Sequence, residues 1–180
     1  MRRLTTRLMP TMILVLLLPL WPAGNAGAQF NGALRGDYNL TNFRTCQVLS
    51  DSGAPLGIEL QIAIQGTITY DGAGAGNFVG KGLAVNASGE TPSDQTCSVS
   101  YTVNADGSFT QQLNCTLTFT ATAATASLNG IQQQGRLSLD GTVVLFTDTE
   151  TNLEILTPIS PPGTGTQRRC NSSGVATSRR

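Results

Sequence analysis

Residues 97–119 read CSVSYTVNADGSFTQQLNCTLTF, and this stretch decides the predicted fold. Apolar and polar side chains alternate on both sides of Asp106-Gly107, which is typical of two half-buried strands joined by a tight turn. Directly opposed residues of such a pair lie close to disulfide distance. The stretch therefore predicts a disulfide-closed hairpin, whose opposed pairs are Val103–Phe109, Tyr101–Gln111, Val99–Leu113 and Cys97–Cys115.

The pairing of the other two cysteines follows from this hairpin. The chain has four cysteines, and spacing alone leaves three ways to join them in pairs. Because the hairpin register selects Cys97–Cys115, the remaining bond is Cys46–Cys170. That bond would join the first strand to the tail of the chain.

Two further hairpins are predicted on either side of the first. Residues 57–70 carry apolar side chains at even positions, and residues 77–85 return after a glycine-rich turn. Setting Tyr70 against Asn77 places Gly66 across from Lys81 and Ile62 across from Val85. In the third hairpin, residues 135–146, Leu137 lies across from Val144. Residues 86–96 and 157–167 are interpreted as irregular connections, the second because it holds three prolines.

The predicted fold class is all-β, a closed antiparallel up-and-down barrel of about eight strands with two disulfides. Three Asp-Gly turns, at positions 71, 106 and 140, are spaced as in a meander. Closure of the sheet would remove its exposed edges. A β-sandwich is the alternative. The barrel domain is expected to span residues 29–175, and residues 176–180 are expected to fray.

The N-terminal segment predicts export. Arg2, Arg3 and Arg7 precede an apolar run, residues 12–21, and Ala26-Gly27-Ala28 fits a cleavage site. Residues 1–28 are therefore interpreted as a secretory signal peptide, which would deliver the protein to the periplasm or the extracellular space. Four cysteines in the exported part fit an oxidising compartment.

Charge excludes some partners. The chain has 11 basic and 11 acidic residues, and the signal segment holds three of the basic ones, so the expected mature chain has a net charge of −3. That balance favours neither a nucleic-acid partner nor a membrane partner after signal cleavage. The sequence does not indicate an oligomeric state.

Several catalytic classes are excluded by composition. There is no histidine in the chain, which removes triads, dyads and imidazole-bound metals. No metal site and no cofactor is predicted. Asp148, Glu150 and Glu154 form the densest group of acids, and the favoured interpretation is a solvated hairpin loop. The alternative is a cation site or an acid–base pair.

Three polar residues share the parity of the apolar faces: Lys81, Tyr101 and Gln111. One interpretation places them inside the barrel, where they would orient a ligand. The other is a fully packed interior with Lys81 at the rim.

The glycine-rich stretch GTITYDGAGAGNFVGKG, residues 66–82, matches no nucleotide-binding motif. Val79 stands where a dinucleotide fingerprint needs glycine, and Lys81 lacks the serine or threonine that ends a phosphate loop. We interpret Gly72, Gly74 and Gly76 as a turn, and the other glycines as sites of strand bending.

Five stretches together resemble small exported bacterial proteins of the lipocalin-like or allene-oxide-cyclase-like barrel type. These stretches are GDYNLTNFRTC, GTITYDGAGAGNFVG, the central cysteine hairpin, LDGTVVLFTDTETNLEI and RRCNSSG. The resemblance implies a barrel that holds an apolar ligand or isomerises one, and it transfers no catalytic residue. The leading hypothesis is an exported barrel that binds a small apolar or amphipathic ligand. The alternatives are a cofactor-free cyclase or isomerase and a structural or interaction protein of the envelope.

Overall fold

The structure is a computed structural model, and it describes residues 28–149 and 153–179. The described residues form one short 3-10 helix, η1, and nine strands. Their bounds are η1 Ala28–Ala33, β1 Arg35–Leu49, β2 Pro55–Asp71, β3 Ala75–Asn86, β4 Gly89–Val103, β5 Ser108–Phe119, β6 Thr125–Leu137, β7 Val143–Asp148, β8 Leu153–Ser160 and β9 Thr166–Ser178. The predicted signal peptide, up to residue 27, and Glu150 lie outside the described residues.

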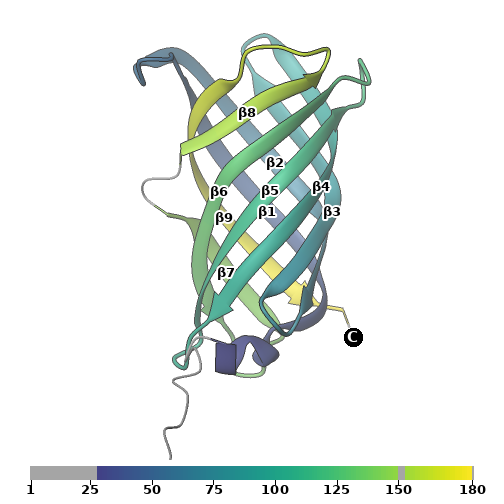
Figure 1. Cartoon of the computed structure of the whole chain (residues 1–180), viewed down its shortest axis with the longest axis vertical. Coiled ribbons are helices and arrows are strands. Elements are labelled where there is room, and N and C mark those ends of the chain that lie inside the picture. The colour runs from purple at the N-terminus through teal and green to yellow at the C-terminus, as the bar shows by residue number, and fades with distance from the viewer. Residues whose placement is uncertain (1–27, 150–152, 180) are drawn as a thin grey trace, which may run out of the picture.

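The strands form a single antiparallel sheet that closes on itself (Figure 1). Consecutive strands pair from β1 to β7, and the ring of hydrogen bonds is completed where β1 pairs with β9. Cys46 lies opposite Cys170 across this closing seam, and the two are joined by a disulfide. The predicted closed barrel is thus confirmed, and the alternative of a sandwich is wrong.

Strands β7 and β8 occupy the same position in the wall, one below the other in Figure 1. β7 pairs with residues 133–137 of β6, β8 pairs with residues 125–129 of β6, and both pair with β9. The nine strands therefore fill eight positions around the barrel, which agrees with the expected number. The division falls at the middle of the wall, between Asp148 and Leu153.

The central hairpin has the predicted register and the predicted Cys97–Cys115 disulfide. The glycines of all three Asp-Gly turns, Gly72, Gly107 and Gly141, have positive φ angles of 79°, 76° and 68°. Left-handed backbone of this kind favours glycine because it has no Cβ. Leu137 lies across from Val144, as predicted for the third hairpin.

The register between β2 and β3 differs from the prediction by one residue. Tyr70 pairs with Gly76, and Ile68 pairs with Phe78. Consequently Phe78 faces the interior and is buried, whereas Val79 is exposed. The reason is space: a Cβ at Gly66 or Gly80 would lie only 2.7 or 2.4 Å from atoms of the Phe78 ring. The two glycines leave room inside the barrel for the Phe78 ring. Val79 and Val85, which the sequence pattern places on the inner face, are therefore on the outer face.

Three predicted irregular segments are partly or wholly strand. Only residues 87 and 88 separate β3 from β4, so the expected loop over 86–96 is wrong. Residues 157–160 continue β8, and the connection to β9 is confined to 161–165. β9 runs to Ser178, and Ala176 is fully buried, so the tail is ordered further than predicted. In each case backbone pairing with a neighbouring strand outweighs polar composition.

One end of the barrel is closed by η1, seen at the bottom of Figure 1. The hydroxyl of Tyr101 donates a 2.9 Å hydrogen bond to the carbonyl of Leu34, just after η1. The side chain of Asn31 accepts a 2.8 Å hydrogen bond from the amide of Val103, at the end of β4. Leu34 is fully buried. These contacts attach the N-terminal segment to the barrel as a plug.

Above this plug lies the main core, built from the inward-facing side chains of the strands. Its largest members are Tyr38, Tyr70, Phe78, Tyr101, Phe109 and Phe146. Tyr70 makes edge-to-face contacts with Tyr38 and Tyr101, at centroid distances of 5.6 and 4.9 Å. The interior of the plugged half of the barrel is therefore filled, so a ligand site inside the barrel would lie in the other half. Among the described residues no helix is both long and apolar enough to cross a bilayer.

Candidate functional site: a cavity with an ionic floor

A cluster of buried charges crosses the middle of the barrel. Arg44 of β1 donates a 3.0 Å hydrogen bond from Nη2 to Oδ2 of Asp148, at the end of β7. The same Nη2 also contacts Oε1 of Glu154 on β8. Arg168 of β9 donates from Nε to Oε2 of Glu154 at 2.9 Å. Two cations and two carboxylates thus form one chain, which we call the ionic floor.

The ionic floor lies deep in the protein. The Arg44, Asp148 and Glu154 side chains are at most 1% exposed. Burial lowers the pKa of Arg44 to about 10, although neighbouring Asp148 acts in the opposite direction. Burial also lowers the pKa of Arg168 to about 10, again opposed by Asp148. Both guanidinium groups therefore remain charged at neutral pH, and the carboxylates compensate for much of the cost of burying them.

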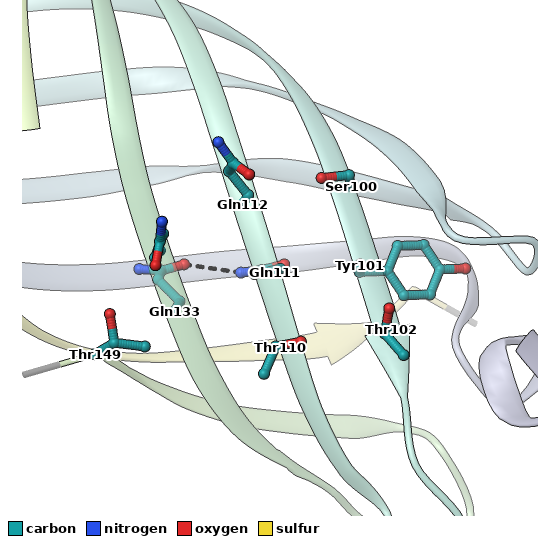
Figure 2. A pocket seen from close by; sticks show the side chains of 9 residues that line it. Ser100, Tyr101, Thr102, Thr110, Gln111, Gln112, Gln133 and Thr149 are labelled. Atoms are coloured by element: carbon teal, nitrogen blue, oxygen red, sulfur yellow. Dashed lines mark hydrogen bonds between the residues drawn. The ribbon is translucent and has the colours of Figure 1, made fainter. Parts of the chain in front are cut away.

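A polar chain connects the ionic floor to the filled half of the barrel. The hydroxyl of Tyr70 donates to Oε1 of Gln111 at 2.8 Å. Gln111 donates from Nε2 to Oε1 of Gln133 at 2.8 Å, as drawn in Figure 2. Gln133 donates to Oδ1 of Asp148 at 3.3 Å, and Ser172 donates to the same oxygen at 2.6 Å. These bonds fix the position of the Asp148 carboxylate.

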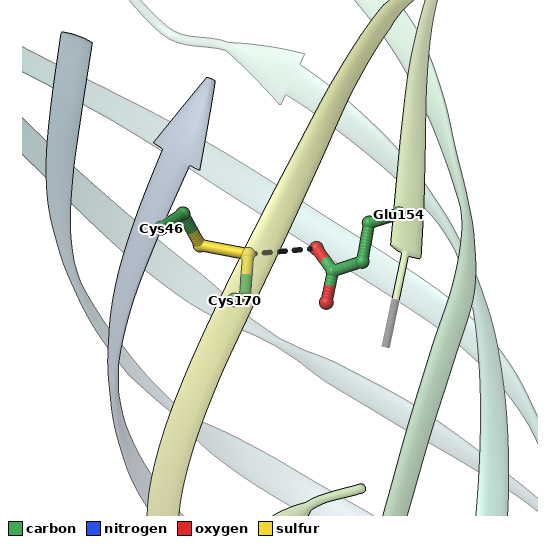
Figure 3. Close-up of side chains that lie close together, drawn as sticks. All are labelled: Cys46, Glu154 and Cys170. Atoms are coloured by element: carbon green, nitrogen blue, oxygen red, sulfur yellow. Dashed lines mark hydrogen bonds between the residues drawn. A yellow bond between two sulfur atoms is a disulfide. The ribbon is translucent and has the colours of Figure 1, made fainter. Parts of the chain in front are cut away.

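The Cys46–Cys170 disulfide lies against the ionic floor (Figure 3). Oε2 of Glu154 is 3.4 Å from Sγ of Cys170. The disulfide sulfur carries no proton, so this is a packing contact. The two sulfurs and the carboxylate lie close enough to suggest a metal site. The disulfide removes both thiolates, and two guanidinium groups bind the carboxylate, so the arrangement does not suit a cation.

Above the ionic floor is a cavity of about 180 Å³, at the end of the barrel opposite η1. Its walls are mostly aliphatic and aromatic, and Arg44 and Arg168 are its charged lining residues. Thr91 lines it and is exposed, so the cavity reaches solvent at this end. The full lining is Arg44, Leu60, Ile62, Ile64, Gly82, Ala84, Thr91, Ser93, Gln95, Leu117, Phe119, Leu128, Ile131, Leu156 and Arg168.

The two arginines that line the cavity carry hydrogen-bond donors without a partner among the described residues. Nε of Arg44 is buried and has no hydrogen-bond partner among the described residues. Arg168 uses Nε for its ion pair, and its two terminal nitrogens have no hydrogen bond within the described part of the chain. A buried donor without a partner costs about 1–3 kcal/mol, so such a group in a native fold needs an explanation.

Glycine shapes the cavity wall. A Cβ at Gly82 would lie 2.1 Å from Nε2 of Gln95. The missing side chain therefore lets the Gln95 amide lie inside the barrel, where it contacts Ser93. The result is a polar ledge on an otherwise apolar wall.

The three predicted ligand-binding residues lie elsewhere. Lys81 is exposed and shares its face of β3 with Val79 and Asn77, so it points outward. Its expected place inside the barrel is wrong because of the one-residue shift in register. Tyr101 and Gln111 are opposite each other and buried, as expected. Both use their polar atoms inside the protein, and neither lines the 180 Å³ cavity.

Tyr101 and Gln111 also border a depression of about 370 Å³ on strands β4 to β6. Figure 2 shows the polar residues around it. Its other lining side chains, such as Ser100, Thr110 and Gln112, are small or neutral. No charged side chain is among its described lining residues, whereas the barrel cavity combines a mostly aliphatic wall with two guanidinium groups, so the barrel cavity is the stronger candidate.

The expected solvated acidic loop is also wrong for the two acids that the structure describes. Asp148 and Glu154 are buried because they continue the inward-facing positions of β7 and β8, where Phe146 and Leu156 face the same way. The partners of these two carboxylates are the buried guanidinium groups of Arg44 and Arg168.

No protein-family model, curated protein or solved structure matches the chain. The fold and the site therefore define the class: a plugged, disulfide-closed antiparallel barrel with a small cavity above an ionic floor. The resemblance to lipocalin-like or cyclase-like barrels stays a prediction.

Proposed function

We propose that this protein is an exported carrier or receptor that holds a small amphipathic molecule in the barrel cavity. The observation that carries the proposal is the unused Nε–H of Arg44 beneath an apolar cavity. Concave apolar sites with a few well-placed polar groups are typical of ligand binding. The volume of about 180 Å³ is below the usual range of roughly 300–1,000 Å³, so the ligand is small. The two disulfides fit the oxidising environment of an exported protein.

The contacts of the two buried acids, Asp148 and Glu154, favour binding over catalysis. Both oxygens of Glu154 contact arginine side chains, and Asp148 accepts hydrogen bonds from Arg44, Gln133 and Ser172. A general acid or base has to reach the proton that it transfers. Carboxylates held in this way suit a structural and electrostatic role better than proton transfer to a ligand.

Native mass spectrometry of protein purified from its own host tests the proposal. We expect a retained small molecule that is lost when Ala84→Leu fills the cavity, because Ala84 lines it beside Ile62. Ala87→Leu is the matched control, since Ala87 is exposed in the β3–β4 turn. Retention of the molecule by Ala84→Leu, with a normal melting temperature, would show that the cavity is not the site.

A role in the cell envelope is the second candidate, and one observation favours it. Leu153, Ile155 and Ile159 project from the outer face of β8 and are 42%, 42% and 50% exposed. Apolar groups gathered in this way mark interaction surfaces. Cross-linking in intact cells, with Ile155→Ser as the comparison, tests this role: an adduct lost in the variant supports it, and an unchanged adduct contradicts it.

A further inference from the structure

The charges of the ionic floor balance one for one. Arg44 and Arg168 supply two positive charges, and Asp148 and Glu154 supply two negative charges within hydrogen-bond distance. Among the described residues that line the cavity, only the two arginines are charged. The floor as a whole is therefore neutral, although it presents cationic groups to the cavity.

This balance decides which head group the cavity accepts. A carboxylate would add a third negative charge beside Glu154, in a place that is screened poorly from it. A buried ion needs its own counter-charge, and both guanidinium groups already have one. An uncharged oxygen acceptor needs only N–H donors, and Arg44 Nε and the terminal nitrogens of Arg168 supply them.

We infer that the ligand is an uncharged molecule with a carbonyl-type oxygen and a short aliphatic body: an amide, ester, lactone or ketone. The oxygen accepts hydrogen bonds from Arg44 and Arg168, and the body lies against the apolar wall that includes Ile62 and Leu128. This inference rests on the proposed function and narrows it, since a fatty-acid carboxylate would be a poor ligand.

Three probes of equal chain length test the head group: hexanamide, hexanoate and hexylamine. Calorimetric titration of the full protein at neutral pH compares their affinities. We expect hexanamide to bind at least about tenfold more tightly than either ion, a difference of about 1.4 kcal/mol. Hexanoate binding as tightly as hexanamide would overturn the inference and leave the proposed function standing. If none of the three binds, the proposed function itself is contradicted.

A charge change inside the floor sharpens the test. Glu154→Gln removes one negative charge with little change in shape, so one arginine loses its counter-charge. We expect the preference to shift toward hexanoate, by at least tenfold relative to hexanamide. Glu59→Gln makes the same chemical change on the exposed outer face near the open end, and it should leave the preference unchanged. An unaltered preference in a folded Glu154→Gln protein would contradict the charge-balance argument. Because the comparison of probes on the unaltered protein needs no variant, poor folding of Glu154→Gln does not remove the test.

Discussion

Arg44 of β1 and Asp148 of β7 form an ion pair 3.0 Å long in which both side chains are about 1% exposed. They stand 104 positions apart in the chain, and only the closure of the barrel brings them together. The pair holds the end of β7 to β1 across the interior of the barrel. Asp148 stands at the break in the wall between β7 and β8. The ion pair is therefore a part of the fold as well as the floor of the cavity.

Removing the carboxylate of this pair should destabilise the protein strongly. Asp148→Asn leaves the Arg44 cation with one fewer counter-charge in a buried place, and breaking such a pair typically costs about 3–5 kcal/mol. Chemical denaturation followed by circular dichroism measures the change in the free energy of unfolding. An effect below about 1 kcal/mol would mean that solvent reaches the ionic floor.

The chain contains a matched exposed pair for comparison. Arg136 and Asp106 are 4.0 Å apart, with side chains 73% and 61% exposed. Exposed pairs of this kind contribute about 0–1 kcal/mol because water and salt screen them. Arg136→Ala should therefore change the free energy of unfolding little, and a large effect would contradict the contrast drawn between the two pairs.

The two disulfides should differ in their contribution to stability. Cys46–Cys170 closes a loop of 124 positions, whereas Cys97–Cys115 closes one of 18. If the main effect is on the entropy of the unfolded chain, the contributions are about 5 and about 3 kcal/mol. Replacing each pair by alanine and comparing melting curves checks the order. A larger loss from the Cys97/Cys115 double variant would be the opposite of what loop length predicts.

The sequence predicts the barrel well because the pattern of alternating side chains and the position of the turns are local features. Cys97 and Cys115 fall opposite each other once the Asp106-Gly107 turn is set, and the structure has this register. The alternation of side chains gives the wrong register for β3. Val79, Lys81 and Val85 suggest that the odd positions face inward, whereas Phe78 and the other even positions do. The Phe78 ring faces inward because Gly66 and Gly80 leave space for it. That packing is a three-dimensional property, and the alternation of residue types along the chain does not reveal it.

Part of the candidate site also has a signal in the sequence. Arg44 and Arg168 each stand two residues before a cysteine of the Cys46–Cys170 bond, so in strands they share its inward face. That signal alone could have placed both guanidinium groups inside the barrel. The burial of Glu154 has no comparable local signal, because it depends on β8 taking up the strand position that β7 leaves.

The packing of an aromatic ring against a glycine gives a further prediction. A Cβ at Gly174 would lie 2.4 Å from two atoms of the Phe146 ring, which is fully inside the barrel. Gly174→Ala should therefore destabilise the protein by roughly 1–3 kcal/mol through overpacking. Combining it with Phe146→Leu should recover part of the loss relative to the sum of the single changes. Gly32→Ala is the control, because nothing lies within 4 Å of the Cβ that it would add.

The three tyrosines should ionise late when the pH is raised. Burial raises the pKa of Tyr70 far above its ordinary value of 10, with further contributions from Tyr38 and Tyr101. Burial also raises the pKa values of Tyr38 and Tyr101. Because the unfolded chain releases these protons near pH 10 and the folded chain keeps them, the tyrosines' contribution to stability is complete below pH 10 and declines above it.

Ultraviolet titration of tyrosinate, with circular dichroism on the same samples, checks this prediction. We expect less tyrosinate above pH 10 than in denaturant, and a late rise that accompanies loss of the barrel signal. Arg44 and Arg168 act in the opposite direction, since their pKa of about 10 lies below that of the unfolded chain. The tyrosinate absorbance is therefore the deciding readout rather than stability alone. Full ionisation of three tyrosines near pH 10 in a folded protein would show that the ring cluster above the η1 plug is open to water.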